Sequence, residues 1–183
     1  AVAAAAGARV VRRLAPPGKG AAMADGVRAS TGDIVVFLDA DVRNFGLHFV
    51  TALVRPLLLD DRLVLAKAAY DRPATPTGGG GRVTELLARP LLRRLVPALA
   101  FLRQPLAGEV AVRRHALADV ALEPGYGVEI GMLIDLARRY GADAIVEVDL
   151  GERVHRNRPL AELSGQADEV LAAVLSRTGF MGG

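Results

Sequence analysis

The chain has 183 residues, which is enough for one domain with a sizeable core and too few to expect two. Hydrophobic residues make up 51% of it and aromatic residues only 4%, so a folded protein with few stacking platforms for bases is expected. The net charge of +3 comes from both signs mixed along the chain, which argues against a nucleic-acid-binding protein with a basic stripe.

Short β-branched runs alternate with longer segments of helical period, which predicts an α/β fold with a mostly parallel sheet flanked by helices. In chain order we predict a strand at 8–12, a helix at 20–30, a strand at 33–38, a helix at 47–59 and a strand at 63–69. The run 33–38 (DIVVFL) is continuous and apolar, as a buried central strand should be.

A loop rich in Pro, Gly and Thr then covers residues 71–81. After it, the pattern predicts a helix at 83–99 with a break near Pro90, a strand at 109–113, a helix at 128–140 and a strand at 144–150. The last helix is expected to start at Pro159, a favoured first-turn position, and to run to about Ser176.

The absence of cysteine excludes disulfides, thiolate metal sites and cysteine nucleophiles, and it favours a cytoplasmic setting. No apolar run approaches the ~20 residues that span a bilayer, so no membrane partner is expected. The Ala-rich start (residues 1–6) has neither an initiator Met nor the basic region of a signal peptide. We interpret the sequence as the interior of a longer chain.

Two carboxylates, Asp39 and Asp41, follow the strand at 33–38. The carboxyl edge of a parallel strand is where open α/β sheets bind ligands. Carboxylate oxygens there suit Mg²⁺ or Mn²⁺, completed by diphosphate oxygens and water. Because Asp is also common at loop entries, the pair alone leaves open the alternative that it only caps the turn.

His155 follows the strand at 144–150 and tips this balance. Imidazole is a good ligand for transition metals and a poor one for Ca²⁺, so a His joining an Asp pair points to Mn²⁺ or Mg²⁺. A lone His is more often a surface or core residue. Here it is surrounded by side chains that would bind phosphate or carboxylate oxygens, namely Arg153, Arg156, Asn157 and Arg158.

Two glycine-rich segments precede predicted helices. The segment 16–20 (PPGKG) lacks the spacing of a P-loop, but its glycines would let the backbone approach a nucleotide, and Lys19 could reach a phosphate or a base carbonyl; an ordinary turn is the alternative. The segment 78–84 (GGGGRVT) could bind an anion. Its glycines leave backbone N–H groups unshielded, the helix expected to start near Val83 offers its positive end, and Arg82 and Thr84 add donors. A flexible linker is the alternative there.

A carboxylate, Glu129, lies in the first turn of the helix predicted at 128–140, after Gly125, Tyr126, Gly127 and Val128. A glutamate at that position gains from the helix dipole whatever its role. The functional interpretation is that Glu129 orients a substrate hydroxyl.

Five strings occur in one order and spacing: FLDADV (37–42), GGRVTELLARPLL (80–92), QPLAGE (104–109), PGYGVEIGMLIDLARRYG (124–141) and VHRNRPL (154–160). Together they closely resemble the glucosyl-3-phosphoglycerate synthases, a family of retaining glycosyltransferases with the GT-A fold. The resemblance extends from about Gly18 to Phe180. It implies a UDP-glucose donor, a 3-phosphoglycerate acceptor, Mg²⁺ or Mn²⁺ as cofactor and a homodimer. The alternatives are a GDP-mannose donor, a polyprenyl-phosphate acceptor, or a non-catalytic remnant that binds sugar phosphates.

The resemblance also implies roles for single residues. The metal would be held by Asp41 and His155, with Asp39 at the ribose, the sugar or the metal; Asp41 and Glu129 would be the catalytic residues. The donor site would comprise Gly18, Lys19, Asp39, Ala40, Tyr126, Gly127, Val128, Glu129, Arg153, Arg156 and Arg158. The acceptor would be bound by Gly81, Arg82, Val83, Thr84 and Asn157. Because no carboxylate is obviously placed as a covalent nucleophile, front-face attack by the acceptor hydroxyl is the mechanistic hypothesis.

These roles divide a single expected domain, 1–183, into a donor and metal part (1–70) and an acceptor part with the C-terminal helix (71–183). GT-A folds begin with a strand and loop that grip the uridine, and nothing before Ala1 supplies them. We therefore expect an N-terminally truncated GT-A domain that binds the donor poorly on its own.

Overall fold

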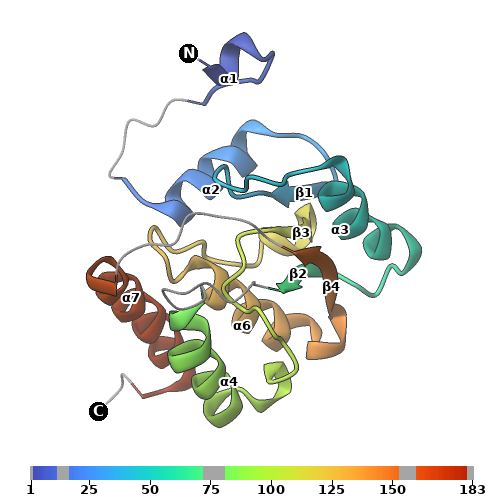
Figure 1. The fold of residues 1–183 in the computed structure, drawn as a ribbon. Coiled ribbons are helices and arrows are strands. Elements are labelled where there is room, and N and C mark those ends of the chain that lie inside the picture. The colour runs from blue at the N-terminus through green and yellow to red at the C-terminus, as the bar shows by residue number, and fades with distance from the viewer. Residues whose placement is uncertain (1, 12–16, 72–80, 153–159, 181–183) are drawn as a thin grey trace.

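The computed structural model describes residues 2–11, 17–71, 81–152 and 160–180 (Figure 1). Most predicted elements are confirmed within about two residues, because their hydrophobic periods are strong. The helices are α1 (Val2–Ala5), α2 (Lys19–Ala29), α3 (Leu47–Leu59), α4 (Arg89–Leu95), α5 (Arg114–Leu117), α6 (Val128–Tyr140) and α7 (Leu160–Thr178). The strands are β1 (Ile34–Phe37), β2 (Leu65–Asp71), β3 (Val110–Arg113) and β4 (Ile145–Glu152).

The strand predicted at 8–12 is wrong for its described part, because residues 8–11 form no regular element. Val10 and Val11 are 51% and 46% exposed, and Arg9 makes its hydrogen bond through the side chain, from Nη1 to the carbonyl of Ala29. A strand needs a neighbouring strand to pair its backbone groups, and the described sheet does not reach this segment. Instead, α1 precedes it and stands apart from the other helices (Figure 1).

The helix predicted at 83–99 is interrupted at a different proline from the one expected. Pro90 is the second residue of α4 and follows a π-helical turn at Thr84–Ala88, in which the amide of Arg89 donates to the carbonyl of Thr84, and the helical backbone continues past the proline. The break comes at Val96, whose φ of −140° and ψ of 62° are not helical, and Pro97 opens a short 3-10 turn. The ring of a proline disfavours the helical conformation of the residue before it.

The described sheet has the strand order β1-β3-β2-β4. β3 runs antiparallel to both of its neighbours, whereas β2 and β4 pair in parallel. The mostly parallel sheet is thus confirmed for the direction of β1, β2 and β4 but not for the pairing, since β3 is inserted between β1 and β2. As a result, β1 lies at an edge of the described sheet and is half-buried, which corrects the expectation of a buried central strand.

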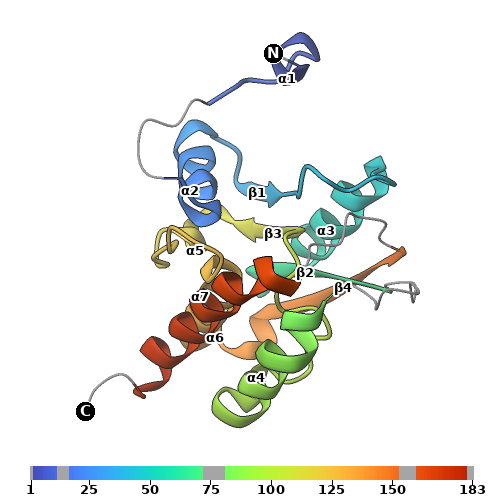
Figure 2. The same ribbon diagram turned by 60° about the vertical axis from the view of Figure 1, so that its left-hand side comes forward.

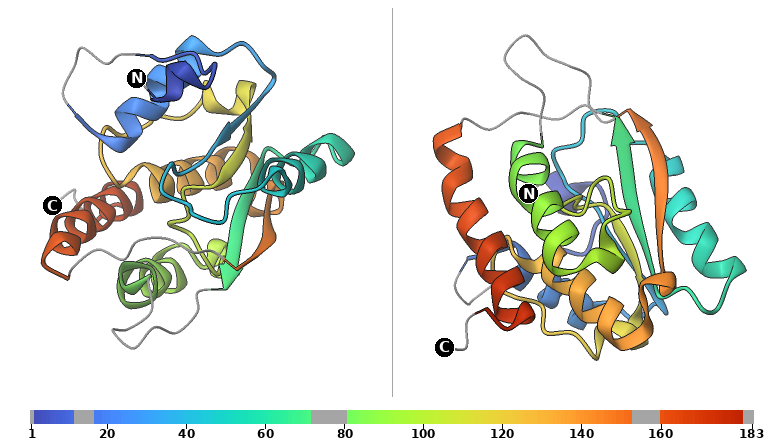
Figure 3. Two further views of the ribbon diagram at one scale, coloured as in Figure 1. Left: turned by 45° about the horizontal axis from the view of Figure 1, so that its top comes forward. Right: turned by 90° about the horizontal axis from the view of Figure 1, so that it is seen from below.

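Helices cover both faces of the sheet. On one face, α3 packs Phe49, Leu53 and Leu57, all fully buried, against Ala66 and Ala68 of β2. On the other face, α4, α6 and α7 form the larger core around β2 and β3 (Figure 3, right). α7 lies beside α6 (Figure 2). In the part of the chain that the structure describes, no helix combines the length and apolar character needed to cross a bilayer.

Candidate functional site at the carboxyl edge of the sheet

Because β1, β2 and β4 point the same way, the segments that follow them leave from one edge of the sheet. A hydrogen bond shows how closely two of these segments approach: Asn44 Nδ2 donates to the carbonyl of Glu152, 2.6 Å away. Asn44 lies three residues after Asp41, and Glu152 is the last residue of β4. The segment 39–44, which we call the acidic segment, therefore crosses the sheet edge from the end of β1 to the end of β4.

Three predicted site residues from different elements meet at this edge. The ammonium of Lys19, at the start of α2, lies 2.9 Å from Asp39 Oδ1 and 2.5 Å from Glu129 Oε1. Asp39 follows β1, and Glu129 lies in the first turn of α6. The side chains of Lys19 and Asp39 are 26% and 24% exposed, whereas that of Glu129 is 4% exposed. Lys19 thus joins the acidic segment to the glutamate across the fold.

The charges in this trio depend on one another. Burial desolvates the Lys19 ammonium and works to lower its pKa, but the carboxylates of Glu129 and Asp39 outweigh this and raise the pKa above its ordinary value of 10.5. Lys19 is therefore a cation throughout the physiological range. Its charge offsets part of the negative charge of Asp39 and Glu129, which both contact the same ammonium.

The glycines around Lys19 are required for packing against another part of the site. A Cβ on Gly18 would lie 2.2 Å from the carbonyl oxygen of Pro124, and a Cβ on Gly20 would lie 1.7 Å from that of Glu123. The amide of Ala21 donates to the Pro124 carbonyl over 3.0 Å. The start of α2 is thereby attached to the segment 123–127, so its glycines have a structural role that sequence alone did not indicate.

The segment 123–127, which carries Tyr126 and Gly127, is also held from the side of α7. Glu169 accepts a 2.5 Å hydrogen bond from the amide of Tyr126. Arg177 pairs with Glu123 and, over 2.8 Å, with Asp135 of α6. These contacts fix the approach to Val128 and Glu129 between α2 and α7.

Four of the five predicted acceptor residues, 81–84, lie at a second helix start. Gly81 has a φ of +90°, a conformation that favours glycine. The carbonyl of Gly81 accepts from the amide of Glu85 over 2.9 Å, so the first helical turn begins there. Thr84 is buried, whereas Arg82 and Val83 are half-buried. The helix start expected near Val83 is confirmed, and it places Arg82 in the first turn.

Some predicted residues fall outside the described part of the chain, so the structure does not place them: Gly78, Gly79, Gly80, Arg153, His155, Arg156, Asn157 and Arg158. Within the described residues no three metal-ligating side chains converge. Asp39 is half-buried beside Lys19, and Asp41 is exposed. Two aspartates i, i+2 together with an imidazole remain a donor set that fits Mg²⁺ or Mn²⁺.

Two buried charged residues at this edge were missed by the sequence analysis: Lys67 of β2 and Glu109, just before β3, both fully buried. The signal that could have revealed them is a single charged residue inside or next to an apolar strand run. Lys67 Nζ donates to the carbonyl of Ala107 over 2.6 Å.

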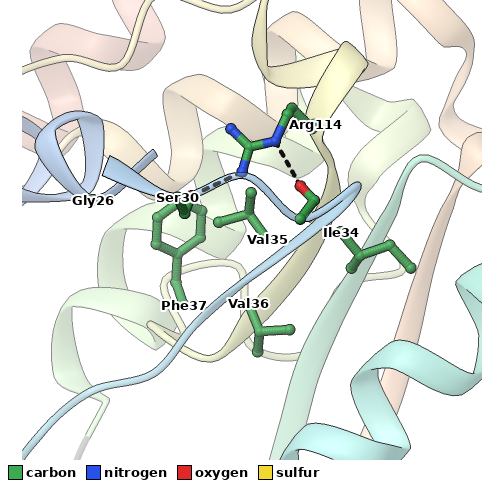
Figure 4. Close-up of a pocket in the computed structure, with 8 residues that line it drawn as sticks. Gly26, Ser30, Ile34, Val35, Val36, Phe37 and Arg114 are labelled. Carbon is green, nitrogen blue, oxygen red and sulfur yellow. Dashed lines mark hydrogen bonds between the residues drawn. The ribbon is translucent and has the colours of Figure 1, made fainter. Parts of the chain in front are cut away.

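A hollow of about 250 Å³ lies along the edge strand β1 (Figure 4). It is lined by the strand residues 34–37 and by Gly26, Ser30 and Gly32 of the segment before them. The guanidinium of Arg114, which also lines it, donates to the carbonyls of Gly32 and Val27 and to Ser30 Oγ. Since this charge is engaged in holding the α2–β1 connection, we assign no substrate group to the hollow.

The sequence is similar to those of known glycosyltransferases. Residues 1–79 match the family Glycosyl transferase family 2. A glucosyl-3-phosphoglycerate synthase from Mycolicibacterium paratuberculosis is 50% identical over 190 aligned residues, covering 96% of this chain and 58% of the relative. The chain thus spans about three fifths of that relative.

Solved structures agree as well. The glucosyl-3-phosphoglycerate synthase of Mycobacterium tuberculosis in complex with Mn²⁺, UDP-glucose and phosphoglyceric acid is 48% identical, with a TM-score of 0.89 over 97% of this chain and 63% of that one. The same enzyme with Mg²⁺ and UDP also has a TM-score of 0.89, at 48% identity, with 97% of this chain and 63% of that one covered. The resemblance read from the sequence is confirmed, and the fold is the GT-A fold.

Proposed function

We propose that the protein transfers glucose, with retention, from UDP-glucose to 3-phosphoglycerate in a reaction that depends on Mg²⁺ or Mn²⁺. The observation that carries this proposal is the Lys19 bridge, which joins Asp39 of the predicted donor and metal part to Glu129 of the predicted acceptor part. The similar solved enzyme binds Mn²⁺, UDP-glucose and phosphoglyceric acid. The division into parts 1–70 and 71–183 belongs to the same proposal.

The metal would be held by Asp41 and His155, with Asp39 beside them. When bound, the cation would offset the negative charge that grows on the departing diphosphate. Donation from Arg153, Arg156 and Arg158 to the same diphosphate would act in the same sense, and it would be stronger in the transition state than in the ground state.

The remaining roles concern orientation of the two substrates. Glu129, fixed by Lys19, would accept hydrogen bonds from hydroxyls of the sugar or of the acceptor, in a pocket lined by residues 126–128. The donor nucleotide would lie near Gly18, Lys19 and Ala40. The acceptor phosphate would bind at residues 81–84, and Asn157 would contact the acceptor near its carboxylate. Attack by the acceptor hydroxyl from the front face needs no covalent intermediate on a carboxylate.

The experiment that tests the function is a UDP-release assay on the full-length protein that carries this sequence. We expect release that requires UDP-glucose, 3-phosphoglycerate and Mg²⁺ or Mn²⁺ together. Transfer from GDP-mannose, or to a polyprenyl phosphate, with no use of the first pair would replace this proposal with the corresponding rival. Binding of the sugar nucleotide without turnover would favour a non-catalytic role.

Arg82→Ala is expected to raise the KM for 3-phosphoglycerate about tenfold or more, with kcat changed less, because a lost charge-assisted hydrogen bond to a phosphate costs ~1.5–3 kcal/mol. Steady-state kinetics with the acceptor varied at saturating donor measures this change. Arg89→Ala is the matched control, since Arg89 follows in the same helical segment and pairs with Glu85 at the surface. An Arg82 variant with a wild-type KM would remove this residue from the acceptor site.

The resemblance further suggests a homodimer in the cytoplasm, which we include in the proposal. Light scattering of the purified full-length protein and fractionation of the cells that make it would test these two points.

A further inference from the structure

Lys67 is a buried cation on an inner strand of the described sheet, paired with Val110 at the start of β3. Its strand, β2, lies between β3 and β4, and its side chain is fully excluded from solvent. Burying an ammonium is costly unless charges and hydrogen bonds compensate. The hydrogen bond from Nζ to the carbonyl of Ala107 supplies one of these compensations.

Carboxylates supply the rest. The pKa of Lys67 is lowered to about 8, chiefly because burial desolvates the ammonium. The carboxylates of Glu129, Glu109 and Asp39 act to raise this pKa, whereas the charge of Lys19 acts to lower it. Lys67 and these four residues form one group of charges, in which Lys19 and Asp39 are partly exposed. Two cations and three anions leave a formal charge of −1 when all are ionised. Without Lys67 the formal charge would be −2, on carboxylates of which Glu109 and Glu129 are 0% and 3% exposed.

Lys67 also holds a loop against the acidic segment. The carbonyl that it binds belongs to Ala107, and the next residue, Gly108, packs on Asp39 so closely that a Cβ would lie 2.1 Å from Oδ1. The amide of Ala68 donates to the carbonyl of Glu109 over 3.1 Å, so both sides of Gly108 are attached to β2. Lys67 and Ala68 therefore fix the backbone of residues 107–109 next to Asp39.

We propose that Lys67 is a positioning residue for glucose transfer: its ammonium fixes the loop 104–108 beside Asp39 and balances the buried carboxylates of Glu109 and Glu129. This inference rests on the proposed function. Because Lys67 is fully buried, it acts through Asp39 and Glu129 rather than by touching a substrate. Nothing in the spacing of the sequence motifs assigns it this task.

A double-mutant cycle in the full-length protein tests the proposal, with Lys67→Met, Glu109→Gln and the two combined. Met keeps most of the side-chain volume, so the change is mainly one of charge. We expect Lys67→Met to lower kcat about thirtyfold or more while the KM for 3-phosphoglycerate changes less than about threefold. The double variant is expected to recover at least about threefold of this loss, because removing an anion together with the cation restores the formal charge. It is expected to stay below Glu109→Gln alone, because the hydrogen bond to the Ala107 carbonyl is still missing.

The control is Arg62→Met, which removes an exposed cation ion-paired with Asp60 shortly before β2 and is expected to leave both constants unchanged. Wild-type kcat in Lys67→Met, or the same loss in the single and the double variant, would overturn the proposal. If Lys67→Met does not fold, the double variant is expected to fold, and its failure while Glu109→Gln folds would also overturn it.

The cycle separates this inference from the proposed function. An inactive wild-type protein contradicts the function itself. In that case the binding of UDP with Mn²⁺ decides the role of Lys67. A disturbed Asp39 is expected to weaken this binding about fivefold in Lys67→Met and by a smaller factor in the double variant, where the charge balance is restored. Equal affinity in Lys67→Met and wild type would reject the positioning role.

Discussion

Asp41→Ala and His155→Ala are each expected to reduce UDP release by the full-length protein to background, a loss of about a thousandfold or more, because a divalent cation supplies several kcal/mol of charge stabilisation at the leaving diphosphate. The structural support is the hydrogen bond from Asn44 to the carbonyl of Glu152. It attaches the chain three residues after Asp41 to the end of β4, three residues before His155.

The two variants are expected to lose Mn²⁺ affinity together with activity, and titration of Mn²⁺ followed by electron paramagnetic resonance would measure this. Because Asp41 is exposed, its variant should keep the thermal stability of the wild type. Asp33→Ala is the matched control, since Asp33 is an exposed aspartate just before the other end of β1. Wild-type Mn²⁺ binding by His155→Ala would exclude that imidazole from the metal shell.

The order and type of most elements could be predicted because each helix or strand had a clear hydrophobic period. The position of β3 could not, because a buried run such as Val110–Arg113 has the same composition whether it pairs in parallel or antiparallel. Its insertion beside β1 also made the apolar run 33–38 an edge of the described sheet. Pairing partners, which decide such positions, lie far apart in the sequence.

The candidate site was predictable to the extent that its residues follow strand ends or start helices. Asp39, Lys19 and Glu129 were all selected in this way, yet their mutual ion pairs were not expected, since Lys19 was assigned to a nucleotide. The two glycines beside Lys19 accommodate carbonyl groups of the segment 123–125, a contact visible only in three dimensions. Lys67 remained hidden because a lysine in a strand is normally exposed on one face.

Lys19→Met is expected to have the second-largest effect on activity, lowering kcat about a hundredfold. Without the ammonium, Asp39 and Glu129 would face each other unbalanced, and Glu129, with a side chain only 4% exposed, would have to remain a charge without this partner or take up a proton. Either change alters how it accepts hydrogen bonds from substrate hydroxyls. Steady-state kinetics of glucose transfer measures the effect.

The same substitution is expected to lower stability. Removing one partner of a buried ion pair costs ~3–5 kcal/mol, and the partial exposure of Lys19 and Asp39 reduces this to about 2 kcal/mol. The raised pKa of Lys19 means that the contribution is fully present below its ordinary value of 10.5 and is lost only as the pH rises above it. Thermal unfolding at pH 7 should therefore show the whole difference between the variant and the wild type.

Arg28→Met provides the comparison on the same helix, because Arg28 forms an exposed ion pair with Asp25, and such pairs contribute ~0–1 kcal/mol. It should leave both kcat and the unfolding temperature nearly unchanged. If Lys19→Met matched this control in both measurements, the bridge between Asp39 and Glu129 would have no functional weight. Such a result would reject the proposal that Lys19 joins the two halves of the site. A fall in the kcat of Lys19→Met with unchanged stability would instead show that the ammonium acts in the reaction and not in the fold.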